Sequence, residues 1–230
     1  MIALTLEQIA KIVGGKTFGD PSKVISAAAV FDSREATKGC LFLALVGQSS
    51  DGHDFTKDAQ SRGATGCLTT REVPGDGVVV SDVLIAVRAL ASYVRDQLPD
   101  LKVIAITGSS GKTTTKDLLA SILSSRAKCV WTKASFNNEL GAPITLLECD
   151  AQTKYCILEM GARHQGDIAA LCDMAKPSVG VVLRVGTAHL GEFGSVEKIA
   201  QTKSELIAGL GPDAVAVLGT YDPYTKAMNS

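Results

Sequence analysis

Residues Lys102 to Thr115 read KVIAITGSSGKTTT, and this stretch sets the fold and the chemistry to expect of the chain. An apolar run leads into a Gly/Ser turn, and Gly111-Lys112-Thr113 then opens a segment of helical character. Backbone N–H groups of a glycine-rich turn can surround phosphate oxygens, and a helix N-terminus adds a partial positive charge. Lys112 is placed to reach the outer phosphates, and the Thr113 hydroxyl to hold Mg²⁺. The stretch therefore predicts a site for ATP and Mg²⁺.

The predicted loop is shorter than the common phosphate-binding loop. Ile106 stands where the eight-residue pattern has its first glycine, which leaves G-x-x-G-K-T. A plain strand-to-helix turn is the alternative interpretation. A kinase or a GTPase is disfavoured, because the loop is short and the sequence shows no guanine-reading or switch motif.

Charge and composition narrow the class of partner. The formal net charge is −1, with Lys+Arg 23 against Asp+Glu 24, so no basic field exists to hold nucleic acid or an anionic membrane. No segment approaches the roughly 18 consecutive apolar residues of a membrane helix. The six cysteines form no C-x-x-C pair and lie mostly in apolar segments, as buried free thiols do. We therefore expect a cytoplasmic protein with small-molecule partners, no nucleic acid and no membrane contact.

Length and hydrophobic pattern predict two α/β domains. Residues 1–81 alternate short strands with two helices, the first capped by Thr5, and form a small α/β unit. The strands are expected at 26–31, 40–46, 66–69 and 78–80, and the helices near 5–13 and 54–62. Ser81 is predicted to cap a helix that opens the second domain, 82–230, and Pro99 to close that helix.

The second domain is predicted to be a mostly parallel, doubly wound sheet. Its apolar runs lack the two-residue alternation of half-exposed strands, which is typical of strands covered on both faces. They lie at 103–106, 156–158, 179–183 and 214–218. Because the chain stops just after a strand and the start of another helix, we expect the last α/β unit to be incomplete.

Polar residues at the ends of these strands are the candidate site residues, because ligands of parallel sheets bind beyond the carboxyl ends. Glu159 ends an apolar run and would bring a carboxylate to Mg²⁺, although a solvated glutamate is the alternative. His189 lies in a glycine-rich turn that could aim its imidazole inward; an isolated histidine is more often a loop residue.

Lys203 is the most informative of these positions. It falls in the centre of a helical stripe made by Val196, Ile199, Ala200, Leu206, Ile207 and Leu210. A buried ammonium without a partner is unfavourable, so the amine should be neutral, ion-paired or modified, for example to a carbamate that binds Mg²⁺. The alternative is that its long stem carries the ammonium out to solvent.

Four further clusters have both a functional and a plain interpretation. Asn137 and Asn138 follow the second strand of the domain and could touch phosphate, or form a helix-entry turn. Arg163 and His164 follow Glu159 and could meet an anionic or peptide group. Asp32-Ser33-Arg34 and Asp51-Gly-His-Asp54 are loop clusters that sequence alone assigns to solvated turns.

Five motifs in order, together with the first domain, resemble the Mur ligase family. They are ITGSSGKTT, SFNNELGAP, LEMGARHQGDI, GTAHLGEFGS and AQTKSEL; FDSREATKGCLFLALVG followed by DGHDF is similar to the family's UDP-sugar-binding domain. The resemblance covers nearly the whole chain. It is strongest to the member that joins D-alanyl-D-alanine to UDP-N-acetylmuramoyl-tripeptide.

The resemblance implies an ATP-dependent amide ligase of peptidoglycan precursor synthesis that works as a monomer through an acyl phosphate. It implies that Gly108, Ser109, Ser110, Gly111, Lys112, Thr113, Thr114 and Asn138 bind ATP, and that Thr113 and Glu159 hold one Mg²⁺. His189 and a carbamylated Lys203 would hold a second. Ser33, Arg34, the stretch from Gly47 to His53, Arg163 and His164 would contact the substrate.

Two departures from the family pattern affect this expectation. The family's third domain is missing from the chain, so we expect no turnover from the chain alone. Gly219 replaces an asparagine associated with adenine, which could weaken nucleotide binding. The alternatives are another Mur-type or folylpolyglutamate-type ligase, or a non-catalytic nucleotide or UDP-sugar binding module.

Overall fold

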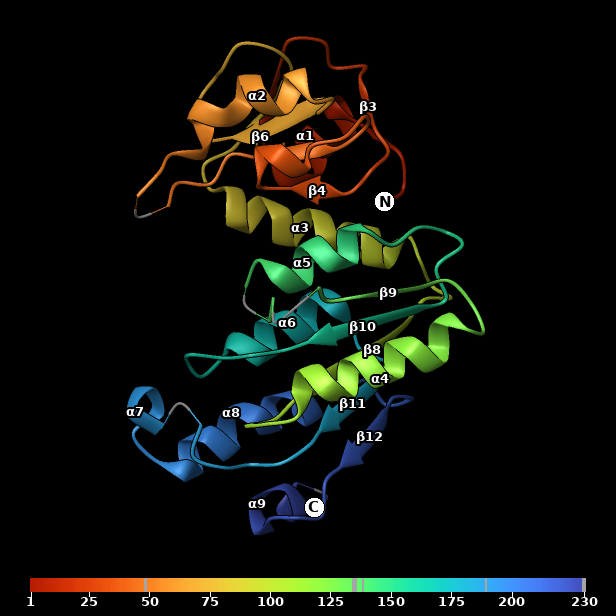
Figure 1. The fold of residues 1–230 in the computed structure, drawn as a ribbon, viewed down its shortest axis with the longest axis vertical. Coiled ribbons are helices and arrows are strands. Elements are labelled where there is room, and N and C mark those ends of the chain that lie inside the picture. Colours follow the sequence, from red (N-terminus) through yellow and green to blue (C-terminus); the bar gives the residue numbers. More distant parts are fainter. Residues whose placement is uncertain (48, 134–135, 138, 189, 229–230) are drawn as a thin grey trace. The chain divides into compact units, whose positions relative to one another are not determined.

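The computed structural model describes residues 1–47, 49–133, 136–137, 139–188 and 190–228 (Figure 1). The chain forms two compact units, Met1–Gln97 with Leu147–Ala151, and Leu98–Leu146 with Gln152–Ser230. The sequence places the boundary after residue 81, whereas helix α3 (Val83–Asp96) groups with the first unit. The reason is that α3 packs on helix α1 (Leu6–Val13) of that unit. None of the described helices is both long enough and apolar enough to cross a bilayer.

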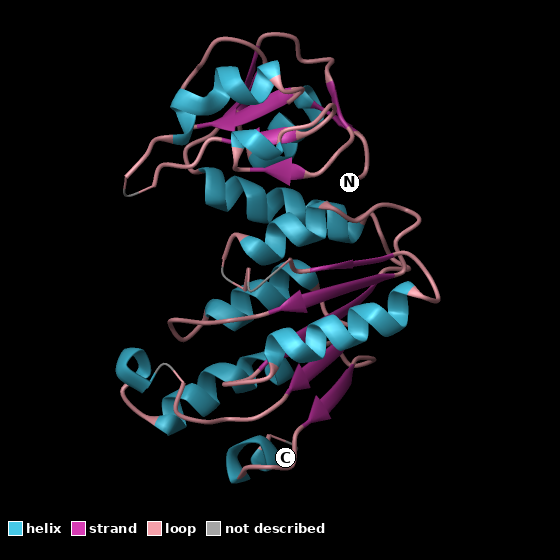
Figure 2. Ribbon diagram, in the orientation of Figure 1, coloured by secondary structure: helices cyan, strands magenta, loops and turns pink. Residues whose placement is uncertain are grey.

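The first unit is built on a five-stranded sheet of order β2-β7-β6-β5-β4 (Figure 2). The strands are β2 (Lys16–Phe18), β4 (Ala29–Val30), β5 (Leu41–Leu43), β6 (Gly66–Thr69) and β7 (Gly77–Val79). The pair β2–β7 is antiparallel and the other pairs are parallel. A separate antiparallel pair joins β1 (Leu4–Thr5) to β3 (Val24–Ile25). The unit also contains helix α2 (Thr56–Ser61) and the 3₁₀ turns η1 (Ser33–Glu35) and η2 (Gly52–Phe55).

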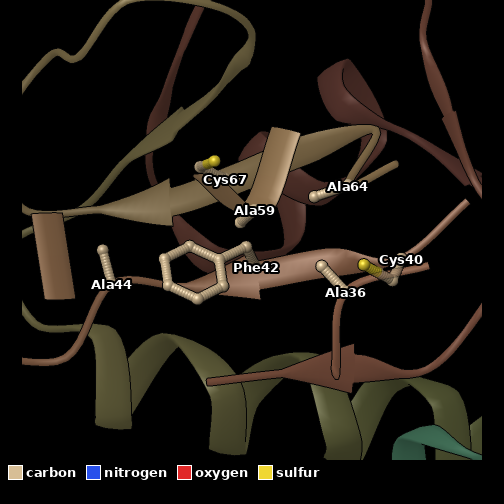
Figure 3. Close-up of a cluster of buried hydrophobic side chains, with 7 residues drawn as sticks. All are labelled: Ala36, Cys40, Phe42, Ala44, Ala59, Ala64 and Cys67. Atoms are coloured by element: carbon tan, nitrogen blue, oxygen red, sulfur yellow. The ribbon is translucent and has the colours of Figure 1, made fainter. Parts of the chain in front are cut away.

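Helices α1 and α2 cover opposite faces of this sheet. Phe42 and Cys67 pack against Ala59 of α2 in one buried cluster (Figure 3). Gly66, one position before Cys67, faces the other way: a Cβ there would lie 2.7 Å from a methyl carbon of Leu6 in α1. Successive strand residues point to opposite faces, so the two contacts define an α/β unit of three layers.

Several local sequence signals agree with the structure and others do not. Thr5 caps α1 in a reciprocal capping box with Gln8. The cap of α3 is Asp82 and not Ser81; the Asp82 carboxylate accepts the Ile85 N–H at 2.9 Å. The strand predicted over 40–46 stops at Leu43, because the Leu45 N–H turns back to the Leu43 carbonyl.

The second unit is a five-stranded sheet of order β12-β11-β8-β10-β9 in which every pair is parallel, as the apolar runs predict. Its strands are β8 (Lys102–Thr107), β9 (Cys129–Trp131), β10 (Tyr155–Glu159), β11 (Val179–Val182) and β12 (Val215–Leu218). Its helices are α4 (Lys112–Ser124), α5 (Gly141–Leu147), α6 (Asp167–Ala175), α7 (Leu190–Phe193), α8 (Val196–Ala208) and α9 (Pro223–Ala227).

Helices α4 and α8 cover opposite faces of this second sheet. Ile106, Ile157 and Val181 form a buried cluster with Ala120 of α4. Gly180 points the other way, since a Cβ there would lie 3.0 Å from a methyl carbon of Leu210, just beyond α8. The sheet is therefore doubly wound. The strand order reverses at β8, which places the usual ligand site of such sheets at the carboxyl end of that strand.

Candidate nucleotide and metal site

The loop Gly108–Gly111 joins the end of β8 to the first turn of α4, as the sequence predicts. Gly111 has φ +86° and Gly108 has φ +150°, conformations that favour glycine. A Cβ on Gly108 would also lie 3.1 Å from the Leu183 Cβ. The first N–H groups of α4 have no acceptor within the helix, and Gly111 has no side chain to cap them. The helix therefore presents N–H donors and its positive dipole end to an anion.

Ser109 anchors this loop to the segment after β11. Its N–H donates to the Arg184 carbonyl at 2.9 Å, and its hydroxyl accepts the Gly186 N–H at 2.9 Å. The Ser109 N–H is thus engaged within the protein. The Lys112 ammonium folds back to the Gly108 carbonyl at 3.1 Å and lies over the loop.

A buried carboxylate faces the start of α4. Glu159, 1% exposed, ends β10. Its Oε2 accepts the Thr113 hydroxyl at 2.9 Å, and its Oε1 accepts the Asn137 amide at 2.8 Å. Glu159 is two residues after Ile157, so it lies on the face of the sheet that α4 covers. The solvated-glutamate alternative does not fit this environment.

Lys203 is buried on α8 with 7% of its surface exposed. Burial lowers the pKa of its amine to about 8, and repulsion from Lys112 adds to the shift. With so little of the residue exposed, the alternative in which the ammonium extends into solvent does not fit.

Two predicted site residues, Asn138 and His189, lie outside the described residues, as does Gln48 within the stretch from Gly47 to His53. Arg163 and His164 follow Glu159 in an exposed turn. Their backbone N–H groups both donate to the carboxylate of Asp167, the first residue of α6, at 2.9 Å. Within the described part of the chain, no hydrogen bond or ion pair joins either side chain to Glu159, so the structure brings them only to the same end of the sheet.

A separate pocket of about 680 Å³ lies in the first unit, and Ser33, Arg34 and Gly47 line it. Arg34 forms a forked ion pair with Asp32, which lowers the pKa of that carboxyl to about 2. Phe31 and Phe55 add aromatic surface. The lining thus combines one cation, the carboxylates of Asp32 and Asp58 and two aromatic rings, which suits a polar ligand with a planar group.

His53 does not line this pocket. It is 4% exposed; its Nδ1 pairs with Asp51 at 2.5 Å, and its Nε2 accepts the Thr70 N–H at 3.0 Å. These bonds define the tautomer, with the proton on Nδ1. The geometry gives His53 a part in holding the turn Gly52–Phe55, two of whose residues line the pocket.

Two buried residues near the carboxylate were missed by sequence reasoning. Thr132 is 0% exposed and its hydroxyl accepts the Glu159 N–H at 3.1 Å. Lys116 is 1% exposed and donates to the Thr132 carbonyl at 2.7 Å. Lys116 falls at helical spacing with the apolar residues Leu119, Ala120 and Leu123, so the pattern that singled out Lys203 could have found it. Thr132 has no comparable signal.

Gly219 has a structural explanation. A Cβ there would lie 1.8 Å from the Leu183 carbonyl oxygen, because the Gly219 N–H donates to the Val182 carbonyl and holds the chain against β11. This backbone accepts no side chain at position 219. The effect of this glycine on nucleotide affinity stays a prediction.

The donor set tests whether Mg²⁺ fits. A carboxylate and a hydroxyl, from Glu159 and Thr113, are hard oxygen ligands of the type Mg²⁺ takes together with phosphate oxygens. Among the described residues no three His, Cys, Asp or Glu side chains form a metal-type cluster. The buried hydroxyl of Thr107, beside the loop, has no hydrogen-bond partner in the part of the chain that the structure describes. These features fit one Mg²⁺ shared with a bound nucleotide.

These features define a P-loop nucleotide-binding protein: a glycine-lined loop lies at the switch point, a lysine lies over it, and a buried carboxylate faces the next helix. Comparison with known proteins identifies the family. Residues 106–230 match the Mur ligase middle domain, and the chain belongs to the Mur ligase family.

Relatives and solved structures agree with this assignment. The chain is 46% identical to the UDP-N-acetylmuramoyl-tripeptide--D-alanyl-D-alanine ligase of Mycobacterium bovis, over 99% of the chain and 50% of that protein. Identity to the enzyme of the same name from Escherichia coli is 38%, over 95% and 48%.

MurF from Acinetobacter baumannii superposes with a TM-score of 0.88 at 38% identity, covering 99% of this chain and 51% of that one. MurF ligase from Thermotoga maritima, solved in complex with ADP, superposes at 0.76 and 35% identity, covering 88% and 48%. The chain spans about half the length of the curated relatives it matches.

Proposed function

We propose that this chain is the UDP-sugar-binding and ATP-binding part of an ATP-dependent amide ligase that joins D-alanyl-D-alanine to UDP-N-acetylmuramoyl-tripeptide. The observation that carries the proposal is the contact between Thr113, in the first turn of the phosphate-binding helix, and the buried Glu159 carboxylate at 2.9 Å. The contact places a hydroxyl and a carboxylate, two groups that can bind a metal ion, beside the N-terminus of α4, where an anion would bind. The names of the relatives that match 95–99% of the chain support the choice of substrates.

The reaction would proceed in two steps. A carboxylate oxygen of the tripeptide forms a bond to the γ-phosphorus of ATP while the bond from that phosphorus to the bridging oxygen breaks, giving an acyl phosphate and ADP. The amine of D-alanyl-D-alanine then forms a bond to the acyl carbon and gives up a proton to solvent, while the bond from that carbon to the phosphate oxygen breaks and inorganic phosphate leaves. Little covalent chemistry falls to the protein, so its residues act by positioning and by neutralising charge.

The residues would divide this work as follows. The Gly108–Gly111 loop and the α4 N-terminus orient the phosphates, and Lys112 neutralises charge on the transferred group. Thr113 and Glu159 would hold one Mg²⁺, which supplies charge neutralisation between the phosphates. Lys203, as a carbamate, and His189 would hold a second. The lowered Lys203 pKa supports this role, because CO₂ adds to the neutral amine.

In the first unit, Ser33, Arg34 and Gly47 would bind the UDP-muramyl part of the substrate, since they line the 680 Å³ pocket. His53 would act by holding the turn beside it. Arg163 and His164 would meet the peptide end of the substrate. The six cysteines are free thiols, five of them buried, which supports a reducing cytoplasm as the compartment. A monomer is proposed as the working state.

Ligand-induced thermal stabilisation tests the proposal. A ligand at concentration L that binds the native state stabilises it by RT ln(1 + L/Kd), so the melting temperature rises with the logarithm of ligand concentration above Kd. UDP-N-acetylmuramoyl-tripeptide and Mg²⁺·ADP should each stabilise the chain, and folate should not. Glu159→Gln should raise the Mg²⁺ concentration for half-maximal ADP stabilisation by about tenfold or more, and exposed Glu72→Gln should leave it unchanged. Stabilisation by folate alone would favour a folylpolyglutamate-type ligase, and equal Mg²⁺ midpoints would remove Glu159 from metal binding.

A further inference from the structure

Lys116 is a buried cation next to the candidate metal site, and the roles described above do not use it. It lies on α4, three residues after Thr113, and is 1% exposed. An ammonium at this depth is unfavourable unless it is hydrogen-bonded and paired. Its nitrogen donates to the Thr132 carbonyl at 2.7 Å and lies 3.0 Å from the Asp117 carboxylate.

The Thr132 carbonyl belongs to the residue that holds Glu159. Thr132 follows β9, and its N–H donates to the Ile157 carbonyl of β10 at 3.0 Å. Its hydroxyl accepts the Glu159 N–H at 3.1 Å. The residue that Lys116 binds is therefore hydrogen-bonded to the backbone of β10 at both Ile157 and Glu159.

These contacts form a closed circuit. It runs from Lys116 on α4 to Thr132, from Thr132 to Glu159, and from the Glu159 carboxylate to the Thr113 hydroxyl at 2.9 Å, back on α4. Thr113 and Lys116 lie one turn apart on the same helix, so α4 contacts the Glu159 region at two points. The backbone at this strand end is also paired with Ile106 of β8, so the two contacts from α4 act on where the Glu159 carboxylate lies relative to that helix.

We propose that Lys116 is a positioning residue for the metal site: acting through Thr132, it holds the Glu159 carboxylate at the distance from Thr113 that a shared Mg²⁺ requires. This inference rests on the proposed function of the site. Groups that support metal ligands from behind change metal affinity when they are removed, even though they do not touch the ion.

Mg²⁺-dependent ADP binding, measured by calorimetry on the 230-residue chain, tests the proposal. Lys116→Met keeps the length of the stem and removes the donor. We expect it to raise the Mg²⁺ concentration for half-maximal ADP binding by about ten- to a hundredfold, with less than about a twofold change in ADP affinity without metal. Thr132→Val should give the same pattern, and Thr132→Ser, which keeps the hydroxyl, should restore the wild-type midpoint.

Two comparisons separate positioning from general support of the fold. Asp117→Asn removes only the exposed partner of Lys116 and should leave the Mg²⁺ midpoint unchanged. The double variant Lys116→Met/Thr132→Val should shift the midpoint no more than either single change, because residues acting in one chain of contacts are not additive. If Lys116→Met does not fold by circular dichroism, Lys116→Arg, which displaces the donor nitrogen, takes its place with the same expected shift.

Two results would overturn the inference. One is a Lys116 variant that lowers the melting temperature yet keeps the wild-type Mg²⁺ midpoint; the other is a double variant whose shift is the product of the single shifts. Failure of the proposed function looks different: wild-type chain would then show no Mg²⁺-dependent ADP binding at all.

Discussion

Replacing Lys203 by methionine should stabilise the protein at neutral pH, although the residue belongs to the candidate site. Methionine keeps most of the buried stem and removes the charge. The pKa of the amine falls from 10.5 in an exposed lysine to about 8 in the native state. At about 1.4 kcal/mol for each pH unit, the charged amine costs the native state about 3 kcal/mol.

The pH dependence follows from the two pKa values. Below pH 8 both the native and the unfolded state carry the proton, so the native state bears the full cost. Between pH 8 and 10.5 the unfolded state holds a proton that the native state has released, and wild-type stability rises with pH. Above pH 10.5 the cost is gone. The advantage of Lys203→Met should therefore be about 3 kcal/mol at pH 7 and shrink towards zero near pH 10.5.

Urea unfolding at several pH values measures this difference. The chain has one tryptophan, Trp131 in β9, so its fluorescence reports on the unit that contains Lys203. The buffers should lack CO₂, metal and nucleotide, since each would change the state of the amine. Exposed Lys198→Met on the same helix is the matched control and should change stability by less than about 0.5 kcal/mol at every pH. A Lys203→Met variant less stable than wild type at pH 7, or an advantage that does not vary with pH, would refute the reasoning.

Two substitutions test other parts of the structure. Gly219→Ala should destabilise the second unit by about 1–3 kcal/mol in the same urea assay, because its Cβ would lie 1.8 Å from the Leu183 carbonyl oxygen. Gly211→Ala is the control, since a Cβ at Gly211 meets open space. Equal stability of the two variants would contradict the packing argument. Arg34→Ala should weaken binding of UDP-N-acetylmuramoyl-tripeptide in calorimetry by about tenfold and leave ADP binding unchanged. Exposed Lys11→Ala should alter neither affinity. If Arg34→Ala binds UDP-N-acetylmuramoyl-tripeptide as tightly as wild type, Arg34 has no part in the pocket's function.

The chain's local patterns were sufficient for the fold class and for the phosphate-binding loop. Glycines at 108 and 111, followed by Lys112 and Thr113, can be recognised without coordinates, because the residues that would surround a phosphate are neighbours in the chain. The apolar runs indicated the parallel sheet, because a strand covered on both faces lacks the two-residue alternation within its own sequence. Helical spacing indicated that Lys203 is buried, since a stripe of side chains is a property of one helix.

Contacts between distant segments could not be obtained in this way. Thr132, Glu159 and Lys116 come from two strand ends and a helix, and their meeting depends on strand order and register, which no local pattern encodes. The same holds for Gly219, whose need for glycine arises from the Leu183 carbonyl just after β11. The bonds of the two His53 ring nitrogens to Asp51 and Thr70 are likewise contacts that the sequence does not reveal. Local chemistry names the groups that can bind a nucleotide, but packing determines which of them face it.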